Sequence, residues 1–106
     1  MTEVLNYIVR MKEIITKSNY KTLSTSEQCS YFSALHVLYE YAEKWVSENG
    51  DDAYQKEKIR NSRYHAYCAL DFLDGDDHAP EEHITWALAD AQSLSDTIRR
   101  KLDVNR

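Results

Sequence analysis

The segment from Arg60 to Tyr67 has the residue types and spacing that could best support chemistry, and it reads RNSRYHAY. An arginine guanidinium pairs strongly with oxyanions such as phosphate, and a histidine transfers protons near neutral pH. The side chains of Tyr64 and Tyr67 could stack on nucleic-acid bases. Four cations make this the most basic region of the chain: Lys56, Lys58, Arg60 and Arg63. A solvated basic helix face is the alternative interpretation of the same residues.

This segment resembles the Arg-x4-6-His signature of the HEPN ribonucleases, through Arg60-Asn61-Ser62-Arg63-Tyr64-His65-Ala66-Tyr67. The Arg-Asn opening and the His-x-Tyr close are similar to toxin subunits that pair with nucleotidyltransferase antitoxins. The resemblance implies an all-helical domain that cleaves RNA at a cleft between two protomers. It further implies that Arg60 stabilises phosphate charge, that His65 acts in proton transfer, and that Tyr67 is the tyrosine that becomes nucleotide-modified.

The spacing places a geometric condition on any joint action of Arg60 and His65. Residues five apart on a helix lie roughly 140° apart around its axis. The two side chains therefore cannot meet on one phosphate from a straight helix. They can do so only if the helix bends or if two copies of the chain pair about a two-fold axis.

An acidic block follows this segment, with no lysine or arginine inside it: Asp71, Asp74, Asp76, Asp77, Glu81 and Glu82. Oxygen-rich loops can bind Ca²⁺ or Mg²⁺. The EF-hand spacing fails here, because placing Gly75 at the sixth loop position puts Leu70 at the first. We therefore expect no metal site. We expect the acids to cap a helix and to present a negative end to a basic protein partner, through Asp74, Asp76, Asp77, Glu81 and Glu82.

The chain has eight tyrosines, which is a high number for a small helical protein. Tyr39, Tyr41, Tyr64 and Tyr67 cannot all face a single core. Tyrosine is favoured at binding surfaces because it offers a large area with few rotatable bonds and a hydroxyl group. We expect these four to contact a partner, with the alternative that they line the edge of the core with their hydroxyls in water.

Other catalytic and cofactor patterns are absent. His36 shares a helix face with Glu40 and Glu43, but no Glu-x-x-His pair occurs, so a di-iron site in a helical bundle is not expected. Two glycines cannot build a phosphate-binding loop or a dinucleotide fingerprint. The four histidines are expected to be ordinary polar positions. We expect no cofactor, and catalysis only if the HEPN resemblance holds.

Apolar residues at helical spacing predict four helices. The first runs from Glu3 to about Lys17, and the second opens on overlapping capping boxes at Ser24 and Thr25 and ends at Asn49-Gly50. The third begins after Asp51 or Asp52 and runs to about Leu73. The fourth has Pro80 at its first position and ends near residue 102. The second helix is apolar over more than half its circumference, so we expect it either to be the most buried or to carry an interface.

These elements predict one domain over residues 1–106, an antiparallel up-down four-helix bundle, because short loops make neighbouring helices run antiparallel. Two glycines and one proline are too few for the many turns of a β-rich domain. The stripe of the third helix is the weakest, since Arg63 interrupts a line formed by Ile59, Ala66 and Leu70.

Charge and composition limit the possible partners and location. A net charge of −5 disfavours binding to DNA or to anionic membranes. No stretch approaches the roughly 20 apolar residues that span a bilayer, and the N-terminus lacks the pattern of a signal peptide. Cys29 and Cys68 lack metal or redox spacing and read as reduced thiols. We expect a cytoplasmic protein.

Two functions follow. The first is a small acidic protein-binding module without catalysis, such as an inhibitor, an immunity or antitoxin-like protein, a phage-encoded antagonist, or a homodimeric accessory protein. The second is a dimeric HEPN-type endoribonuclease that uses Arg60 and His65 on RNA. A protein partner and a homodimer are expected in the first case, and RNA only in the second.

Overall fold

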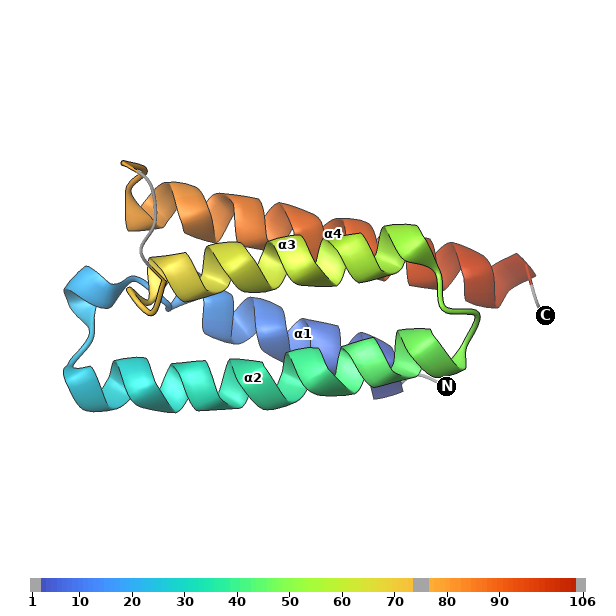
Figure 1. The fold of residues 1–106 in the computed structure, drawn as a ribbon, viewed down its shortest axis with the longest axis horizontal. Coiled ribbons are helices and arrows are strands. Elements are labelled where there is room, and N and C mark those ends of the chain that lie inside the picture. Colours follow the sequence, from blue (N-terminus) through green and yellow to red (C-terminus); the bar gives the residue numbers. More distant parts are fainter. Residues whose placement is uncertain (1–2, 74–76, 105–106) are drawn as a thin grey trace.

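The computed structural model describes residues 3–73 and 77–104 of the chain. This part forms four α-helices, one short 3₁₀ helix and no strand, so the all-α prediction is confirmed (Figure 1). The elements are α1 (Glu3–Thr16), η1 (Tyr20–Thr22), α2 (Thr25–Glu48), α3 (Ala53–Ala69) and α4 (Pro80–Val104). Two residues of the acidic block that was predicted to contact a basic partner, Asp74 and Asp76, lie outside the described residues.

Local capping chemistry sets most helix ends. Ser24 and Glu27 form a capping box at the start of α2, one of the two alternatives that the sequence left open. At its end Gly50 adopts a φ of 106°, and the Asp51 N–H donates to the Val46 carbonyl, which makes a glycine-dependent Schellman cap. Asp52 caps α3 by accepting from the Gln55 N–H. α4 begins at Pro80 as predicted.

The third helix ends earlier than the sequence predicted, at Ala69 rather than near Leu73. Asp71 takes a left-handed φ of 66°, and the Phe72 N–H donates to the Tyr67 carbonyl. This is the same cap as at Gly50, but an aspartate occupies the position where glycine is usual. The apolar Phe72 and Leu73 therefore lie after the helix and are exposed.

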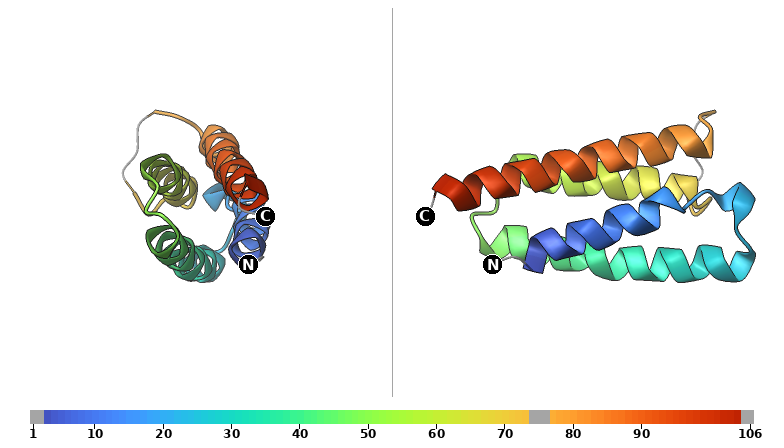
Figure 2. Two further views of the ribbon diagram at one scale, coloured as in Figure 1. Left: turned by 90° about the vertical axis from the view of Figure 1, so that its right-hand side faces the viewer. Right: turned by 180° about the vertical axis from the view of Figure 1, so that it is seen from behind.

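Each helix packs against the next one along the chain, and α1 packs against α4. Seen end on, the helices surround a common interior (Figure 2). One apolar cluster draws buried side chains from all four helices, among them Ile8, Leu35, Ile59 and Ile98. The closest packing is between α3 and α4, where small side chains such as Ser62, Ala66, Ala87 and Ala91 are buried.

Burial is distributed differently from the sequence expectation. α2 has four buried side chains, whereas α3, with the weakest apolar stripe, has seven. The difference arises because α3 buries small or polar residues, including Gln55 and Ser62, which a hydrophobic pattern does not detect. α2 is therefore not the most buried helix, and part of its apolar surface faces solvent. Cys29 is exposed and Cys68 is buried.

Candidate functional site

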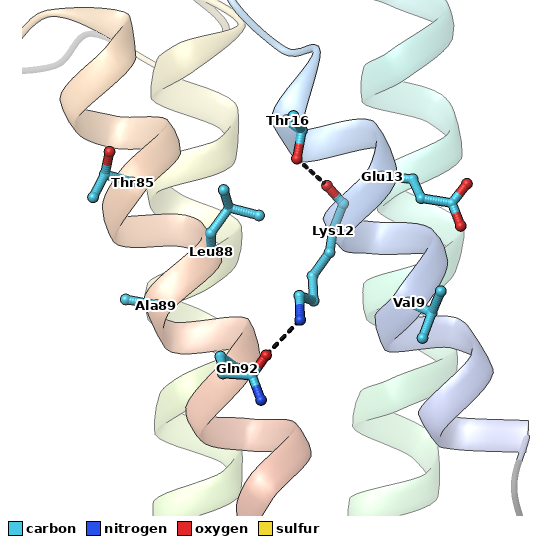
Figure 3. A pocket seen from close by; sticks show the side chains of 8 residues that line it. All are labelled: Val9, Lys12, Glu13, Thr16, Thr85, Leu88, Ala89 and Gln92. Atoms are coloured by element: carbon cyan, nitrogen blue, oxygen red, sulfur yellow. Dashed lines mark hydrogen bonds between the residues drawn. The ribbon is translucent and has the colours of Figure 1, made fainter.

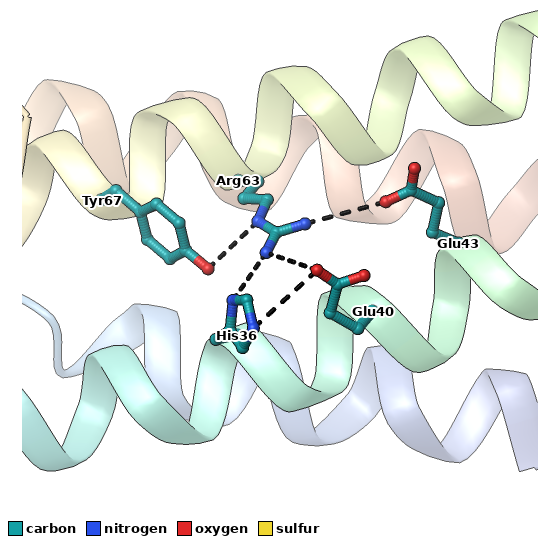
Figure 4. A network of polar contacts seen from close by, with 5 residues as sticks. All are labelled: His36, Glu40, Glu43, Arg63 and Tyr67. Carbon is teal, nitrogen blue, oxygen red and sulfur yellow. Dashed lines mark hydrogen bonds and ion pairs between the residues drawn. The ribbon is translucent and has the colours of Figure 1, made fainter.

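A polar network between α2 and α3 has Arg63 at its centre (Figure 4). The Arg63 guanidinium donates to the Tyr67 hydroxyl at 3.1 Å, to His36 Nδ1 at 2.7 Å and to Glu40 at 3.2 Å. It also pairs with Glu43 at 3.7 Å. Because arginine can only donate, His36 Nδ1 must accept, which leaves its proton on Nε2 beside Glu40. The guanidinium thus ties α3 to the His36 face of α2.

Ionisation in this network is governed by burial and by Arg63. Burial alone lowers the pKa of Arg63, but its bonds to Tyr67 and Glu40 raise that pKa above the usual value. Burial raises the pKa of Tyr67, and the hydrogen bond from Arg63 opposes this effect. Burial also raises the pKa of Tyr39, against its bond to Ser62. Arg63 is thus a permanent cation that already has two carboxylate partners, so the network holds the helices together rather than binding an anion.

The sequence reasoning named Arg60 as the important arginine of this segment and did not assign this role to Arg63. The signal that could have found it is on α2, where His36, Glu40 and Glu43 share a face at steps of four and three. Such a face can pair with a cation on a neighbouring helix. Which arginine of α3 supplies that cation depends on the rotation of α3 about its own axis, and the segment RNSRYHAY does not specify that rotation.

Arg60 and His65 face different sides of α3. Arg60 is exposed and lines a small hollow between α2 and α3, together with Glu43 and Ile59. His65 lines a hollow between α3 and α4, together with Trp86. This agrees with the expected angle of about 140° between them. Within one protomer the structure does not bring these two predicted site residues together.

Three histidines and a tryptophan form a cluster between α3 and α4. The Nδ1 atoms of His65 and His83 lie 3.0 Å apart, so one ring must donate and the other must accept. The Trp86 ring centroid lies 4.7 Å from that of His78 and 5.2 Å from that of His65. The sequence predicted ordinary polar positions for the four histidines and did not indicate that three of them would contact one another. A hollow of about 480 Å³ opens beside the cluster, with Asn61 and Asp90 also in its lining.

The four tyrosines predicted to contact a partner separate into two groups. Tyr39 has no exposed surface and Tyr67 is 8% exposed, so the prediction is wrong for both, which belong to the core. Tyr39 of α2 faces α3, and Tyr67 of α3 faces α2, so both are buried between these helices beside Arg63. Their ring centroids lie 6.2 Å apart. Tyr41 and Tyr64 are 50% and 42% exposed and remain available at the surface.

The described acids of the predicted partner-binding block are exposed, but they also have local roles. Glu81 accepts a hydrogen bond from Asn19 at 2.6 Å, and Glu82 pairs with His78 at 2.7 Å. Glu81 and Glu82 lie in the first turn of α4, where a carboxylate is favourable to the helix dipole. Asp77 is exposed just before this helix. Glu81 and Glu82 therefore place negative charge at the start of α4, and nothing in this arrangement distinguishes a partner.

An apolar groove between α1 and α4 was not identified from the sequence (Figure 3). It measures about 650 Å³, and Val9, Leu88 and Ala89 supply its apolar walls. Lys12 of α1 bonds to Gln92 of α4 across it. The only sequence signal was Val9, which widens the apolar face of α1 beyond the line that packs into the core. Whether such a residue is covered depends on the distance between α1 and α4.

Two further features bear on function. Over residues 3–73 and 77–104, no three histidine, cysteine or acidic side chains converge as metal ligands would. None of the helices in this part is long and apolar enough to cross a membrane. Compared with protein-family models, with curated proteins and with solved structures, the chain finds no match.

Proposed function

We propose that this chain is a non-catalytic protein-binding module that contacts a basic protein through the outer surface of α2. The supporting observation is Tyr41, which is 50% exposed while its ring packs on Tyr7 of α1 at 5.3 Å. Val37, one turn earlier, is 45% exposed on the same helix. We name this surface, made of Tyr7, Val37 and Tyr41, the α2 face. A tyrosine held in place by a second ring loses little entropy on binding, as interface anchors do.

The charge of α2 favours a basic partner. The helix has four glutamates and a single lysine. Glu40 and Glu43 contact Arg63, yet their side chains remain 52% and 50% exposed and can accept further bonds. The whole chain has a net charge of −5, which steers basic partners toward it. The aromatic anchors of the α2 face supply contact area, and carboxylates elsewhere on α2 supply the selection for positive charge.

We also infer that the four helices constitute an antiparallel up-down bundle within one domain. This inference rests on the packing of each helix against its neighbours in sequence, with α1 against α4 closing the ring. In Figure 1 the chain reverses direction at each connection between helices. In this arrangement α2 contributes one side to the core and leaves the opposite side, with Val37, to solvent.

A photo-crosslinking amino acid at position 41 should capture a protein in cells of the source organism. Position 54 is the matched control, because Tyr54 is 46% exposed but lies on α3. We expect an adduct at position 41 with a protein of basic isoelectric point, at a yield several-fold above position 54. The yield of this adduct should fall as the salt concentration is raised, and no adduct should form in the Val37→Glu variant. Equal yields at positions 41 and 54, or a yield insensitive to Val37→Glu, would contradict the proposal.

A dimeric HEPN-type endoribonuclease is the second proposal. The observation that favours it is the open hollow in which His65 lies beside His78 and Trp86, where a base could stack and protons could be exchanged. Arg60 would have to come from another protomer, since it faces the groove between α2 and α3.

Expression of the wild type beside Arg60→Ala and His65→Ala tests this second proposal. If the chain is such a nuclease, the wild type should arrest growth and fragment RNA, and each variant should lose both effects. Arg99→Ala is a control, because Arg99 is an exposed arginine on α4 outside the RNSRYHAY segment. Normal growth with intact RNA in the absence of any antitoxin would exclude the nuclease.

A further inference from the structure

The groove between α1 and α4 has the form of a docking site rather than of a small-molecule pocket. Val9 is 48% exposed at its edge, and Leu88 and Ala89 line the opposite wall. Its volume of about 650 Å³ would hold a drug-sized ligand. Such a ligand would leave much of its surface in water, because the groove runs openly along the two helices (Figure 3). A protein side-chain ridge covers a groove of this kind more completely.

The electrostatics of the groove differ from those of the whole chain. Its lining contains one lysine and one glutamate, Lys12 and Glu13, beside neutral residues. The chain as a whole has a net charge of −5. A strongly basic protein would gain little from this balanced patch and is better matched by the α2 face. A second copy of the chain meets no excess of like charge here.

We propose that a second copy of this chain occupies the groove, in a two-fold symmetric contact between the α1 helices. A two-fold interface must be complementary to itself, so a ridge and the hollow that receives it must lie side by side on one surface. Val9 and the groove satisfy this requirement. When the two α1 helices run antiparallel, Val9 of one copy enters the groove of the other near its Lys12 and Thr16.

The charges on the outer face of α1 suit the same arrangement. Arg10 and Glu13 are exposed and lie 3.6 Å apart within one helix. In an antiparallel pairing whose axis passes between residues 11 and 12, Arg10 of each copy faces Glu13 of the other. The contact thus forms two equivalent opposite-charge pairs, one on either side of the two-fold axis.

This dimer places the predicted nuclease residues unfavourably. The helices pack in a ring, α1 with α2, α2 with α3, α3 with α4 and α4 with α1. The hollow lined by Arg60 lies between α2 and α3, on the side away from the α1–α4 groove. Arg60 of one copy would then stay distant from His65 of the other. A dimer through α1 and α4 therefore supports the binding module over the nuclease, although it does not depend on either proposal.

Sedimentation velocity over a concentration series tests the dimer. We expect wild-type protein to dimerise and Val9→Lys to weaken the dimer on the order of 100-fold, because each dimer would bury two added ammonium groups, each near Lys12 of the other copy. Val37→Lys is the matched control, since Val37 is 45% exposed on α2, and it should dimerise like the wild type. Helical circular dichroism should be unchanged in both variants, and their thermal unfolding should match that of the wild type at concentrations where the wild type is monomeric. A monomeric wild type, or equal weakening by both substitutions, would overturn the inference.

Charge reversal tests the register of the contact. Arg10→Glu and Glu13→Arg should each weaken the dimer by about 3-fold to 10-fold, a range typical of exposed ion pairs. The double variant should recover the wild-type dissociation constant. Failure of this rescue would exclude the antiparallel α1 pairing. Because the crosslinking test at position 41 concerns another surface, loss of the dimer and loss of the basic partner are separate outcomes.

Discussion

Replacement of Tyr39 by alanine should lower the free energy of unfolding by about 3–5 kcal/mol, as for other large-to-small changes in cores. Tyr39 is completely buried in α2. Its hydroxyl lies 2.8 Å from Ser62 Oγ, and the Ser62 hydroxyl donates its only proton to the Ala87 carbonyl at 2.9 Å. Tyr39 must therefore donate to Ser62. The chain of hydrogen bonds joins α2, α3 and α4 in the interior, and alanine would remove both this link and the packing of the ring.

Chemical denaturation measured by circular dichroism checks this effect. Tyr41→Ala is the matched control, because Tyr41 lies two residues further along α2 and is half exposed, and it should change stability by less than about 1 kcal/mol. Tyr39→Phe should cost about 0.5–1.5 kcal/mol, the usual net value of one hydrogen bond. Similar losses for Tyr39→Ala and Tyr41→Ala would show that the burial assigned to Tyr39 is wrong.

Replacement of Gln55 by methionine should raise the free energy of unfolding by about 1–3 kcal/mol, the cost of a buried amide without hydrogen bonds. Gln55 is 1% exposed in the first turns of α3. Neither its Oε1 nor its Nε2 has a hydrogen-bond partner. Methionine has a similar length, an equal helix propensity and no strongly polar atom, so it can fill the same space.

Gln28→Met provides the opposite control in the same assay. The Gln28 side chain donates to the Leu70 carbonyl at 3.0 Å and so helps to hold the end of α3. This substitution should lower stability by about 0.5–1.5 kcal/mol. If Gln55→Met destabilises the protein as Gln28→Met does, the amide of Gln55 contributes a favourable interaction, and the buried position is not simply a polar defect.

The role of Arg63 shows how tertiary structure redistributes functions among residues of one segment. The sequence suggests Arg60 and His65 as a pair, because their types and spacing resemble a known signature. The fold turns Arg63 toward Glu40 and Glu43 of α2, turns His65 toward His83 of α4, and leaves Arg60 exposed. Residues two or five apart on a helix, as Arg63 and Arg60 are from His65, point roughly 140–160° apart, so their neighbours come from different helices.

The tyrosines show the same limit. Tyr39 and Tyr41 are two residues apart on a helix that is apolar over most of its surface, and nothing local distinguishes them. Their burial differs completely because α2 packs against α1 and α3 with only one side toward the common core, and Tyr39 is on that side. For α3 the error is reversed, since Gln55 and Ser62 are polar and yet buried. Close packing against small residues of α4 decides this, and hydrophobic periodicity does not report it.

By itself the sequence determined the four helices, most of their ends and the all-α class. These properties depend on capping residues, turn residues and apolar spacing within a few positions of one another, and such interactions are local. It missed the end of α3 because Asp71 takes the left-handed position where glycine is expected. Only the tertiary structure decided the Arg63 network, the histidine cluster, the α2 face and the α1–α4 groove. Each of these joins residues from different helices, and their meeting depends on the rotation and separation of packed helices, which no local pattern encodes.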